Sequence, residues 1–327
     1  MRLSVVVPVY NERASIGGTV RRLGEAVRQT SFELDLVVVD DGSSDGSGAE
    51  AAAAAEPLGG RVLRQENRGR FAARRAGLGA AQGEFVLFLD SRVLLAEGAL
   101  RFVEERVGQG ERVWNGHVHI DVSTAVGRFW NVLTELAFAQ YFSNPKTTSF
   151  DAESFDRFPK GTTCFLAPAA LLREAFARHS ATYYRDERNA NDDTPVIRWI
   201  AERERIHISP SFACVYAPRS TLPGFVKHAA HRGVVFLDGH GRRASRFFPI
   251  VVAFYPASSA LVVLAVLVPW VGPAAVVLVA ALAAAVALVR RRSRAEVVAF
   301  GVLAPVYALA HGFGMWRGAF LAVGGRR

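Results

Sequence analysis

Hydrophobic and polar positions divide the first hundred residues into short Val- and Leu-rich runs and intervening stretches with helical spacing. This pattern is typical of an α/β domain in which helices cover both faces of a parallel sheet. We expect strands at residues 4–9, 34–39, 61–64 and 85–89, and helices near residues 15–28, 47–55 and 70–81. Ligands of such sheets bind beyond the carboxyl ends of the strands, so the polar residues after each run form the candidate site.

The pattern between residues 113 and 220 is mixed, and the clearest element there is a helix at residues 169–178. His117, His119 and Asp121 alternate along the chain and would share one face of a strand. These residue types bind metal ions, but the same alternation describes any half-solvated strand. Both interpretations are open at this point.

Long apolar runs occupy the end of the chain. No charged residue occurs from Phe247 to Val289, and one membrane span needs about 20 apolar residues, so this run predicts two spans joined at residues 269–273. A third run at residues 297–316 contains Pro305 and His311, and it predicts either a third span or a partly inserted helix. Buried helices of a soluble core are excluded by the length of the runs and by their lack of a polar face.

The net charge of +9 is concentrated around these apolar runs. Residues 290–327 hold seven Arg against one Glu, three further Arg stand at positions 242, 243 and 246, and residues 1–241 are neutral overall. A nucleic-acid-binding domain would carry its basic residues on the folded domain, so we expect no nucleic acid partner.

The positive-inside rule places both basic clusters in the cytoplasm. The expectation is therefore a multi-pass protein of the inner membrane with a cytoplasmic catalytic domain. A full third span would leave Arg326 and Arg327 outside, which favours a re-entrant or interfacial final helix. The two cysteines, Cys164 and Cys214, are too few for a disulfide framework, and the start of the chain lacks the cleavage site of a secretory signal.

Four motifs follow one another in the first ninety residues. They are Val5-Val-Val-Pro-Val-Tyr-Asn-Glu12, Val37-Val-Val-Asp-Asp-Gly-Ser-Ser-Asp45, Asn67-Arg-Gly-Arg-Phe-Ala-Ala-Arg-Arg-Ala-Gly77 and Ala81-Gln-Gly-Glu-Phe-Val-Leu-Phe-Leu-Asp90. In order and spacing they resemble the nucleotide half of the family 2 glycosyltransferases. The resemblance implies a GT-A fold, which is a Rossmann-like domain with a mostly parallel sheet, followed here by C-terminal membrane helices.

The resemblance also implies a site for a nucleotide diphosphate sugar. Its expected residues are Pro8, Tyr10, Asn11, Glu12, Asp40, Asp41, Arg74, Asp90 and Arg92. Glu12 or Asp41 can accept from a uracil N–H or a ribose hydroxyl, Asp40 can fix the turn, and Arg74 is expected near the phosphates. Taken alone, Asp40 and Asp41 are also common as turn-capping residues.

Asp90-Ser91-Arg92 stands where the family has Asp-x-Asp, whose carboxylates hold Mg²⁺ or Mn²⁺ across the diphosphate. Arg92 departs from that pattern, because a cation cannot bind a metal ion but can neutralise phosphate charge directly. Three interpretations follow: a metal held by Asp90 and other ligands, a metal replaced by Arg92, or an inactive protein.

Asn191-Asp192-Asp193-Thr194 resembles the acceptor-site motif of the family. The resemblance makes Asp193 the candidate general base for an inverting transfer and Asp192 its neighbour. The alternative is a helix N-cap before Pro195. Farther along, Lys227, His231 and Arg232 are expected near the diphosphate or an anionic lipid acceptor, or else as a basic cluster beside the membrane.

We therefore predict a catalytic domain at residues 1–240, two or three membrane helices at residues 247–316 and a basic tail at residues 317–327. The expected activity is inverting transfer of a sugar, from a UDP-linked donor in most relatives, to a polyprenyl phosphate or lipid-linked saccharide in cell-envelope or exopolysaccharide synthesis. The Gln-x-x-Arg-Trp string of processive synthases does not occur, which favours single-sugar transfer. The alternative is a non-catalytic membrane partner that has kept the fold.

Overall fold

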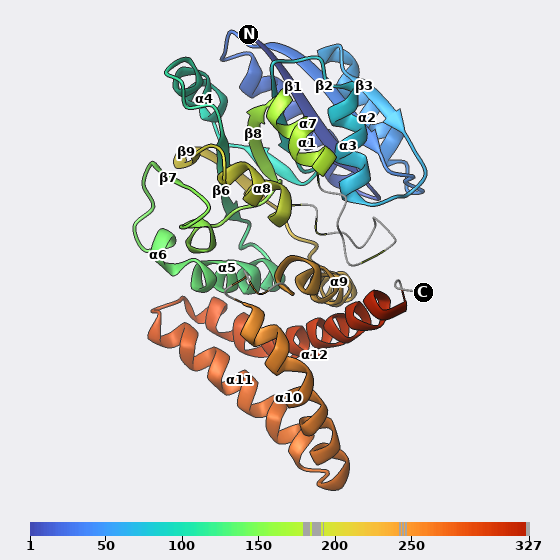
Figure 1. Cartoon of the computed structure of the whole chain (residues 1–327), viewed down its shortest axis with the longest axis vertical. Helices are drawn as coiled ribbons and strands as arrows, with labels where there is room; N and C mark the ends of the chain where they lie inside the picture. Colours follow the sequence, from blue (N-terminus) through green and yellow to red (C-terminus); the bar gives the residue numbers. More distant parts are fainter. Residues whose placement is uncertain are drawn as a thin grey trace.

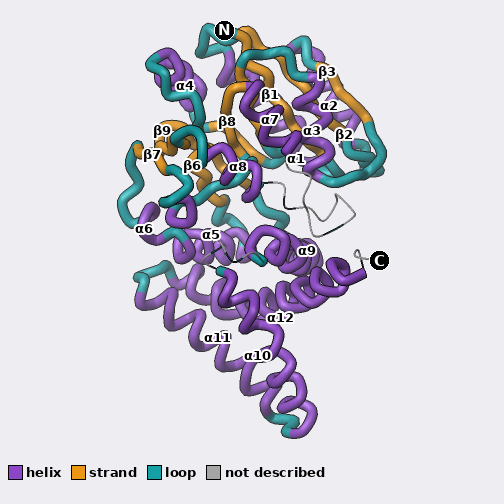
Figure 2. The backbone as a smooth tube through the Cα atoms, viewed as in Figure 1, coloured by secondary structure: helices purple, strands orange, loops and turns teal. Residues whose placement is uncertain are grey.

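Nine strands of the described residues form one mixed sheet, seen in Figures 1 and 2. The structure is a computed structural model that describes residues 1–178, 184, 191, 193–241, 243, 245 and 247–324. The strands are β1 (Arg2–Val9), β2 (Glu33–Asp40), β3 (Arg61–Arg64), β4 (Phe85–Leu89), β5 (Val93–Leu95), β6 (Trp114–Ile120), β7 (Thr148–Phe150), β8 (Cys164–Pro168) and β9 (Ile206–Tyr216). Their order is β3-β2-β1-β4-β8-β6-β9-β5, and β7 pairs with β9.

The first half of the sheet is parallel. β1 pairs with β2 and β4, and β2 pairs with β3, all in parallel register. Seven of the eight residues of β1 are buried, as expected for a strand covered on both faces. This half confirms the four strands that the Val-rich runs predict, and it brings Tyr10, Asp41 and Asp90 to one edge of the sheet.

The second half of the sheet has mixed directions. β8 runs antiparallel to β4 and β6, whereas β6 and β9 are parallel and β5 and β7 are antiparallel to β9. The pairing of β6 with β9 shifts register between Gly116 and His117. These strands fall in the region where the sequence pattern is mixed, so the fully parallel arrangement applies only to the first four strands.

Helices cover both faces of the sheet. They are α1 (Arg13–Val27), α2 (Ser47–Ala55), α3 (Arg70–Ala80), α4 (Ala99–Gly108), α5 (Ala125–Ala137), α6 (Ala139–Phe142), α7 (Ala169–Arg178), α8 (Thr194–Ala201) and α9 (Leu222–His240), with short 3₁₀ turns η1 (Glu56–Leu58) and η2 (Phe155–Arg157). One core joins β1 to α1, α2 and α4, and a second core on the opposite face joins the sheet to α3, α7 and α8.

Three C-terminal helices project away from the sheet (Figure 1): α10 (Phe248–Leu267), α11 (Val271–Val289) and α12 (Arg294–Gly324). Each is long and apolar enough to cross a membrane. α10 and α11 form a hairpin whose most apolar windows are only 6% buried, whereas the corresponding window of α12 is 33% buried. α12 therefore belongs partly to the protein interior. It continues through the first eight positions expected as a basic tail.

α12 lies along α5 and α9, between the sheet domain and the α10–α11 hairpin (Figure 1). An apolar cluster that includes Phe129, Trp130 and Phe300 joins α5 to α12, and Arg292 pairs with Glu135 of α5. α9 and α12 approach most closely at Gly233 and Gly314. A Cβ on Gly314 would overlap the carbonyl oxygen of Ala230, so the crossing requires glycine there.

Candidate functional site

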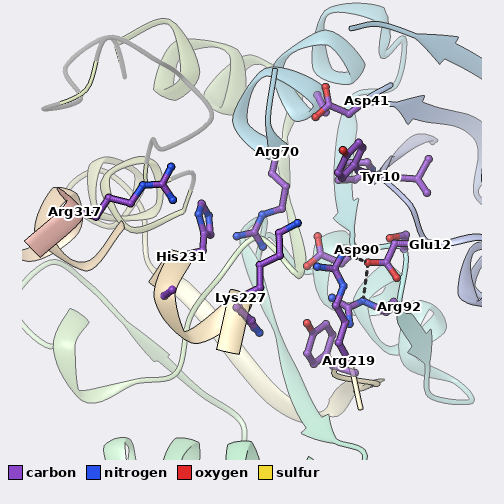
Figure 3. Close-up of a pocket in the computed structure, with 17 residues that line it drawn as sticks. Tyr10, Glu12, Asp41, Arg70, Asp90, Arg92, Arg219, Lys227, His231 and Arg317 are labelled. Carbon is purple, nitrogen blue, oxygen red and sulfur yellow. Dashed lines mark hydrogen bonds and ion pairs between the residues drawn. The ribbon is translucent and has the colours of Figure 1, made fainter. Parts of the chain in front are cut away.

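A pocket of about 350 Å³ opens at the carboxyl ends of β1, β2 and β4 (Figure 3). Its wall is completed by the segment after β9, by α9 and by the distal part of α12. The lining residues are Pro8, Val9, Tyr10, Glu12, Asp41, Arg70, Ala73, Asp90, Ser91, Arg92, Tyr216, Arg219, Lys227, His228, Ala230, His231 and Arg317. The pocket therefore brings together eight residues that the sequence proposes for a ligand site: Pro8, Tyr10, Glu12, Asp41, Asp90, Arg92, Lys227 and His231.

Glu12 is held by two guanidinium groups. Its Oε1 accepts a hydrogen bond from Nη2 of Arg219 at 2.6 Å and lies 3.4 Å from Nε of Arg92. Arg92 also lies over the ring of Tyr216, with its Cζ 5.3 Å from the ring centroid. Glu12 thus fixes two cations at the wall of the pocket.

Asp40 and Asp41 have separate roles at the end of β2. Asp40 is buried and accepts from the backbone N–H of Ser43 at 2.9 Å, as expected for a residue that fixes the turn. Asp41 lines the pocket and accepts from the side chain of Gln65 and from the backbone N–H groups of Arg68 and Gly69, at 2.7, 2.9 and 2.9 Å. The Asp41 carboxylate therefore holds the loop that leads into α3.

Asn11 joins the first two of these loops. It adopts φ 52°, a left-handed conformation that Asn tolerates better than most residues. Its backbone N–H donates to Oγ of Ser43, and its side-chain oxygen accepts from the N–H of Ser44 at 2.9 Å. Asn11 does not line the pocket, so its position is that of a residue supporting the turn.

Asp90 is paired with the buried Arg74, whose Nη2 lies 2.5 Å from Oδ1. Arg74 does not line the pocket itself and contacts it through Asp90. Two positions later Arg92 takes the place of the second carboxylate. Among the described residues, no three His, Cys, Asp or Glu side chains lie close enough together to hold a metal ion. No set of three protein ligands thus surrounds Asp90 in the described part of the chain, and its expected role as a metal ligand stays a prediction.

The wall opposite Glu12 and Asp90 is cationic. Arg70 from α3, Lys227 and His231 from α9, and Arg317 from α12 line it, and Figure 3 shows Arg70 and Lys227 extending toward each other. In the part of the chain that the structure describes, neither Lys227 nor Arg317 pairs with a carboxylate. Cations that line a cavity without such partners favour an anionic ligand.

His228 lies beside this wall but is uncharged. Burial, together with the nearby charges of Arg232 and Arg70, lowers the pKa of His228 well below its ordinary value. Its ring lies 5.0 Å from that of Trp130. Arg232 does not line the pocket, because its guanidinium lies over the Trp130 ring at 4.9 Å. The structure therefore separates Arg232 from Lys227 and His231, with which the sequence analysis groups it.

Asp193 directly precedes α8 and is its N-cap. Its Oδ1 accepts from the N–H of Thr194 at 2.6 Å, and Asn191 beside it accepts from the same N–H at 3.0 Å. Asp193 does not line the pocket. The capping interpretation is thus confirmed by geometry, and the base role stays a prediction. Asp192 lies outside the described residues, as do Arg242, Arg246, Arg326 and Arg327 of the predicted basic clusters.

His117, His119 and Asp121 do not form a metal site. His117 and His119 lie on β6 with ring centroids 4.5 Å apart, and Asp121 follows the strand. His117 is buried and its Nδ1 lies 2.7 Å from the hydroxyl of Tyr141. Burial, with the charge of His119 adding to it, lowers the pKa of His117 to about 4. The alternation reflects a half-buried strand.

Sequence reasoning missed several lining residues: Arg70, Tyr216, Arg219 and Arg317. Arg70 stands inside the quoted Asn67–Gly77 motif and could have been singled out there. Arg219 follows a strand that was not predicted, and Arg317 was assigned to the basic tail. For these two, the sequence holds no local signal that would bring them to the pocket.

A sequence model of glycosyl transferase family 2 matches residues 4–178, which is more than half of the chain. Among curated proteins, the undecaprenyl-phosphate 4-deoxy-4-formamido-L-arabinose transferase of Serratia proteamaculans is 39% identical over 93 residues, covering 28% of each chain. The protein of that name from Pseudomonas aeruginosa is 34% identical over 131 residues, covering 39% of this chain and 38% of the relative. The matches thus span only 28% and 38% of these relatives.

Solved structures share the fold over a larger part of the chain. The mannosyltransferase PcManGT from Pyrobaculum calidifontis, in complex with GDP-Man and Mn²⁺, superposes with a TM-score of 0.56 at 19% identity, covering 96% of this chain and 86% of that one. TarS 1-349 from S. aureus, in complex with UDP-GlcNAc, gives a TM-score of 0.50 at 18% identity, covering 73% and 67%. At these identities the likeness concerns the fold.

Proposed function

This chain belongs to glycosyl transferase family 2, and from that premise we propose that it transfers a sugar from a nucleotide diphosphate sugar to a polyprenyl phosphate at a membrane surface. The donor lies at the strand ends beside Tyr10, Glu12 and Asp41. The curated relatives are named as transferases of undecaprenyl phosphate, which supports this choice of lipid.

The observation that carries the proposal is the composition of a single pocket. One side of it comes from the strand ends of the family 2 domain, and the other comes from Lys227, His231 and Arg317 on α9 and α12. α12 is also a candidate membrane helix. A cationic wall that continues into such a helix suits an acceptor whose phosphate is attached to a lipid chain.

A phosphate acceptor also suits the position of Asp193. A phosphate oxygen is an anion at neutral pH and attacks the anomeric carbon without losing a proton, so the reaction needs no general base. As the new C–O bond forms, the bond from the anomeric carbon to the β-phosphate breaks, and the nucleoside diphosphate leaves with the electron pair. A hydroxyl acceptor would need a free carboxylate to remove its proton, and Asp193 does not line the pocket. The carboxylates that do line it, those of Glu12, Asp41 and Asp90, are each held by other groups.

The membrane arrangement follows from the apolar surface and the charges. The side chains of α10 and α11 are largely exposed, including Val266 and Leu267 at 76% and 72%, which suits a lipid environment. The basic residues at the start of α12 support a cytoplasmic position for the sheet domain, and we propose a multi-pass protein of the inner membrane. Donor nucleotides are then supplied from the cytoplasm.

The test is transfer by the full chain purified in detergent. Radiolabelled UDP- and GDP-linked hexoses are offered with undecaprenyl phosphate, and with undecaprenol as a matched acceptor that lacks the phosphate. We expect label in the lipid fraction with undecaprenyl phosphate and none with undecaprenol. Transfer to undecaprenol, with none to the phosphate, would contradict the proposed acceptor.

The alternative is a non-catalytic membrane partner. It is supported by Asp90-Ser91-Arg92, which lacks the second carboxylate of the Asp-x-Asp motif. Such a protein would bind a nucleoside diphosphate but would neither transfer nor hydrolyse the sugar. Calorimetric binding of UDP and GDP, carried out on the same preparation, separates this case from a protein that binds no nucleotide.

A further inference from the structure

We infer that this chain holds the diphosphate of its donor with guanidinium groups in place of a divalent metal, and that Arg92 is the central group. This inference rests on the proposed function, because it concerns the donor half of the same pocket. It departs from the metal-holding Asp-x-Asp arrangement that the resemblance implies.

The first argument is that every carboxylate lining the pocket already has donors. Glu12 accepts from Arg219 and lies against Arg92, and Asp90 is paired with Arg74. Asp41 accepts three hydrogen bonds from the loop before α3. A metal ion binding here would have to displace at least two of these charge-assisted contacts.

The second argument is the charge of the lining. Five permanently cationic side chains line the pocket against three carboxylates, and Figure 3 shows Arg92 and Arg219 on the side of Asp90 and Glu12. The five are Arg70, Arg92, Arg219, Lys227 and Arg317. A divalent cation placed among them would be repelled, whereas a diphosphate that brings its own negative charge would be attracted.

The third argument is that Arg92 is held in place before any ligand arrives. Its Nε faces Glu12 at 3.4 Å, its Nη1 lies 3.4 Å from the carbonyl oxygen of Ala217, and its Cζ lies over Tyr216. Only 16% of the side chain is exposed. A planar guanidinium fixed in this way loses little conformational freedom on binding phosphate.

The cations also suit the chemistry of the leaving group. When the bond to the anomeric carbon breaks, the departing nucleoside diphosphate gains negative charge on its β-phosphate. Preorganised donors aimed at that charge stabilise the transition state more than the ground state. In this pocket the donors are arginine N–H groups.

The test is calorimetric titration of the full chain in detergent with UDP, GDP and dTDP, once in EDTA and once in MnCl₂. We expect at least one nucleotide to bind with Kd values that agree within about threefold in the two conditions, because no step of binding uses the metal. Binding that requires Mn²⁺ would overturn the inference and leave the proposed function intact. Absence of binding for all three nucleotides in both conditions would overturn the proposed function itself.

Two variants sharpen the result. Arg92→Gln should weaken binding in EDTA by roughly ten- to hundredfold, the usual effect of losing a hydrogen bond to a charged group. Arg92→Lys keeps the positive charge but loses the paired N–H groups of the guanidinium. Its affinity for the nucleotide in EDTA should lie between those of Arg92→Gln and the wild type. Arg101→Gln, on the exposed face of α4 and outside the pocket lining, is the matched control and should bind normally.

Thermal unfolding of each variant identifies any that fails to fold. If folded Arg92→Gln binds as tightly in EDTA as the wild type, Arg92 does not hold the diphosphate and the inference is wrong. If it binds only after Mn²⁺ is added, the metal can occupy the site once the guanidinium is removed, which supports the inference that Arg92 stands in the place of the metal.

Discussion

The carboxylate of Glu12 lies 2.6 Å from the guanidinium of Arg219, although 207 residues separate the two in the sequence. The contact joins the loop after β1 to the segment that leads from β9 into α9. Since Arg92 lies against the same oxygen, Glu12 positions two cations of the pocket at once. Glu12 also lines the pocket, and its expected role as a direct acceptor from the nucleotide stays a prediction.

Glu12→Gln should weaken binding of the nucleoside diphosphate by about tenfold, because the amide cannot hold two guanidinium groups by charge. Calorimetric titration in EDTA measures the effect. Glu25→Gln, which removes an exposed pair with Arg22, is the control and should change nothing. Tighter binding by Glu12→Gln would show that Glu12 competes with the diphosphate for the arginines and does not position them.

Asp193→Asn separates the two roles considered for this residue. Asn is as good an N-cap as Asp, so α8 should keep its stability and the Tm should stay within about a degree. With undecaprenyl phosphate as acceptor we expect turnover within about threefold of the wild type, because no proton is removed. A loss of about 10²- to 10⁴-fold would identify Asp193 as a general base.

Arg317→Gln should raise the KM for undecaprenyl phosphate by about tenfold and leave the Kd for the nucleotide unchanged, since the side chain lies at the membrane side of the pocket. Arg317→Lys should recover part of the loss. Arg290→Gln, on the exposed end of α11, serves as the control for a general loss of positive charge near the lipid. If Arg317→Gln raises the Kd for the nucleotide as much as the KM for undecaprenyl phosphate, Arg317 contributes to the donor half of the pocket.

The crossing of α9 and α12 should not tolerate a side chain at Gly314. Gly314→Ala would place its Cβ against the carbonyl of Ala230, and we expect destabilisation of about 1–3 kcal/mol, seen as a lower Tm in detergent. Gly272→Ala on α11 is the matched control, because its Cβ would meet only Ala265 at 4.0 Å. Equal Tm values for the two variants would contradict the close crossing.

The buried His117 predicts a pH dependence of stability. Its pKa is about 4 in the folded chain, against an ordinary value of 6.5, so the unfolded state binds the proton first as the pH falls. Stability from the neutral ring is complete above pH 6.5 and is lost as the pH falls toward 4. Between pH 7 and 4.5 the Tm of the wild type should fall more than that of His117→Gln, by roughly 3 °C. His119→Gln, on the exposed part of the same strand, should keep most of the wild-type dependence.

The parallel half of the sheet could be predicted because its signal is local. Residues 85–89 are a continuous apolar run, Val62 and Leu63 form a short apolar pair, and the structure places strands at residues 61–64 and 85–89 as predicted. The second half could not, because β6 and β9 pair across a register shift and their side chains are only partly buried. In that region the alternation at residues 117–121 marks part of β6 but gives neither its partner nor its register.

Most predicted residues of the candidate site follow a predicted strand, whereas Lys227 and His231 on α9 were proposed only from the resemblance to family 2. Tyr10, Glu12, Asp41 and Asp90 each come after an apolar run, so the topology of a parallel sheet brings them together. The partners of those residues could not be predicted. The pairing of Asp90 with Arg74 and of Glu12 with Arg219 depends on tertiary packing, which no periodicity in the chain records.

The glycine contact between α9 and α12 couples a candidate membrane helix to a wall of the pocket. α9 presents Lys227 and His231 to the pocket and Gly233 to α12, which in turn supplies Arg317. A chain truncated after His240 would lose one wall of the pocket and expose the face of α9 that α12 covers. On the proposed function the pocket needs the sheet domain together with α12, so a preparation for binding studies has to retain that helix and replace the lipid around it.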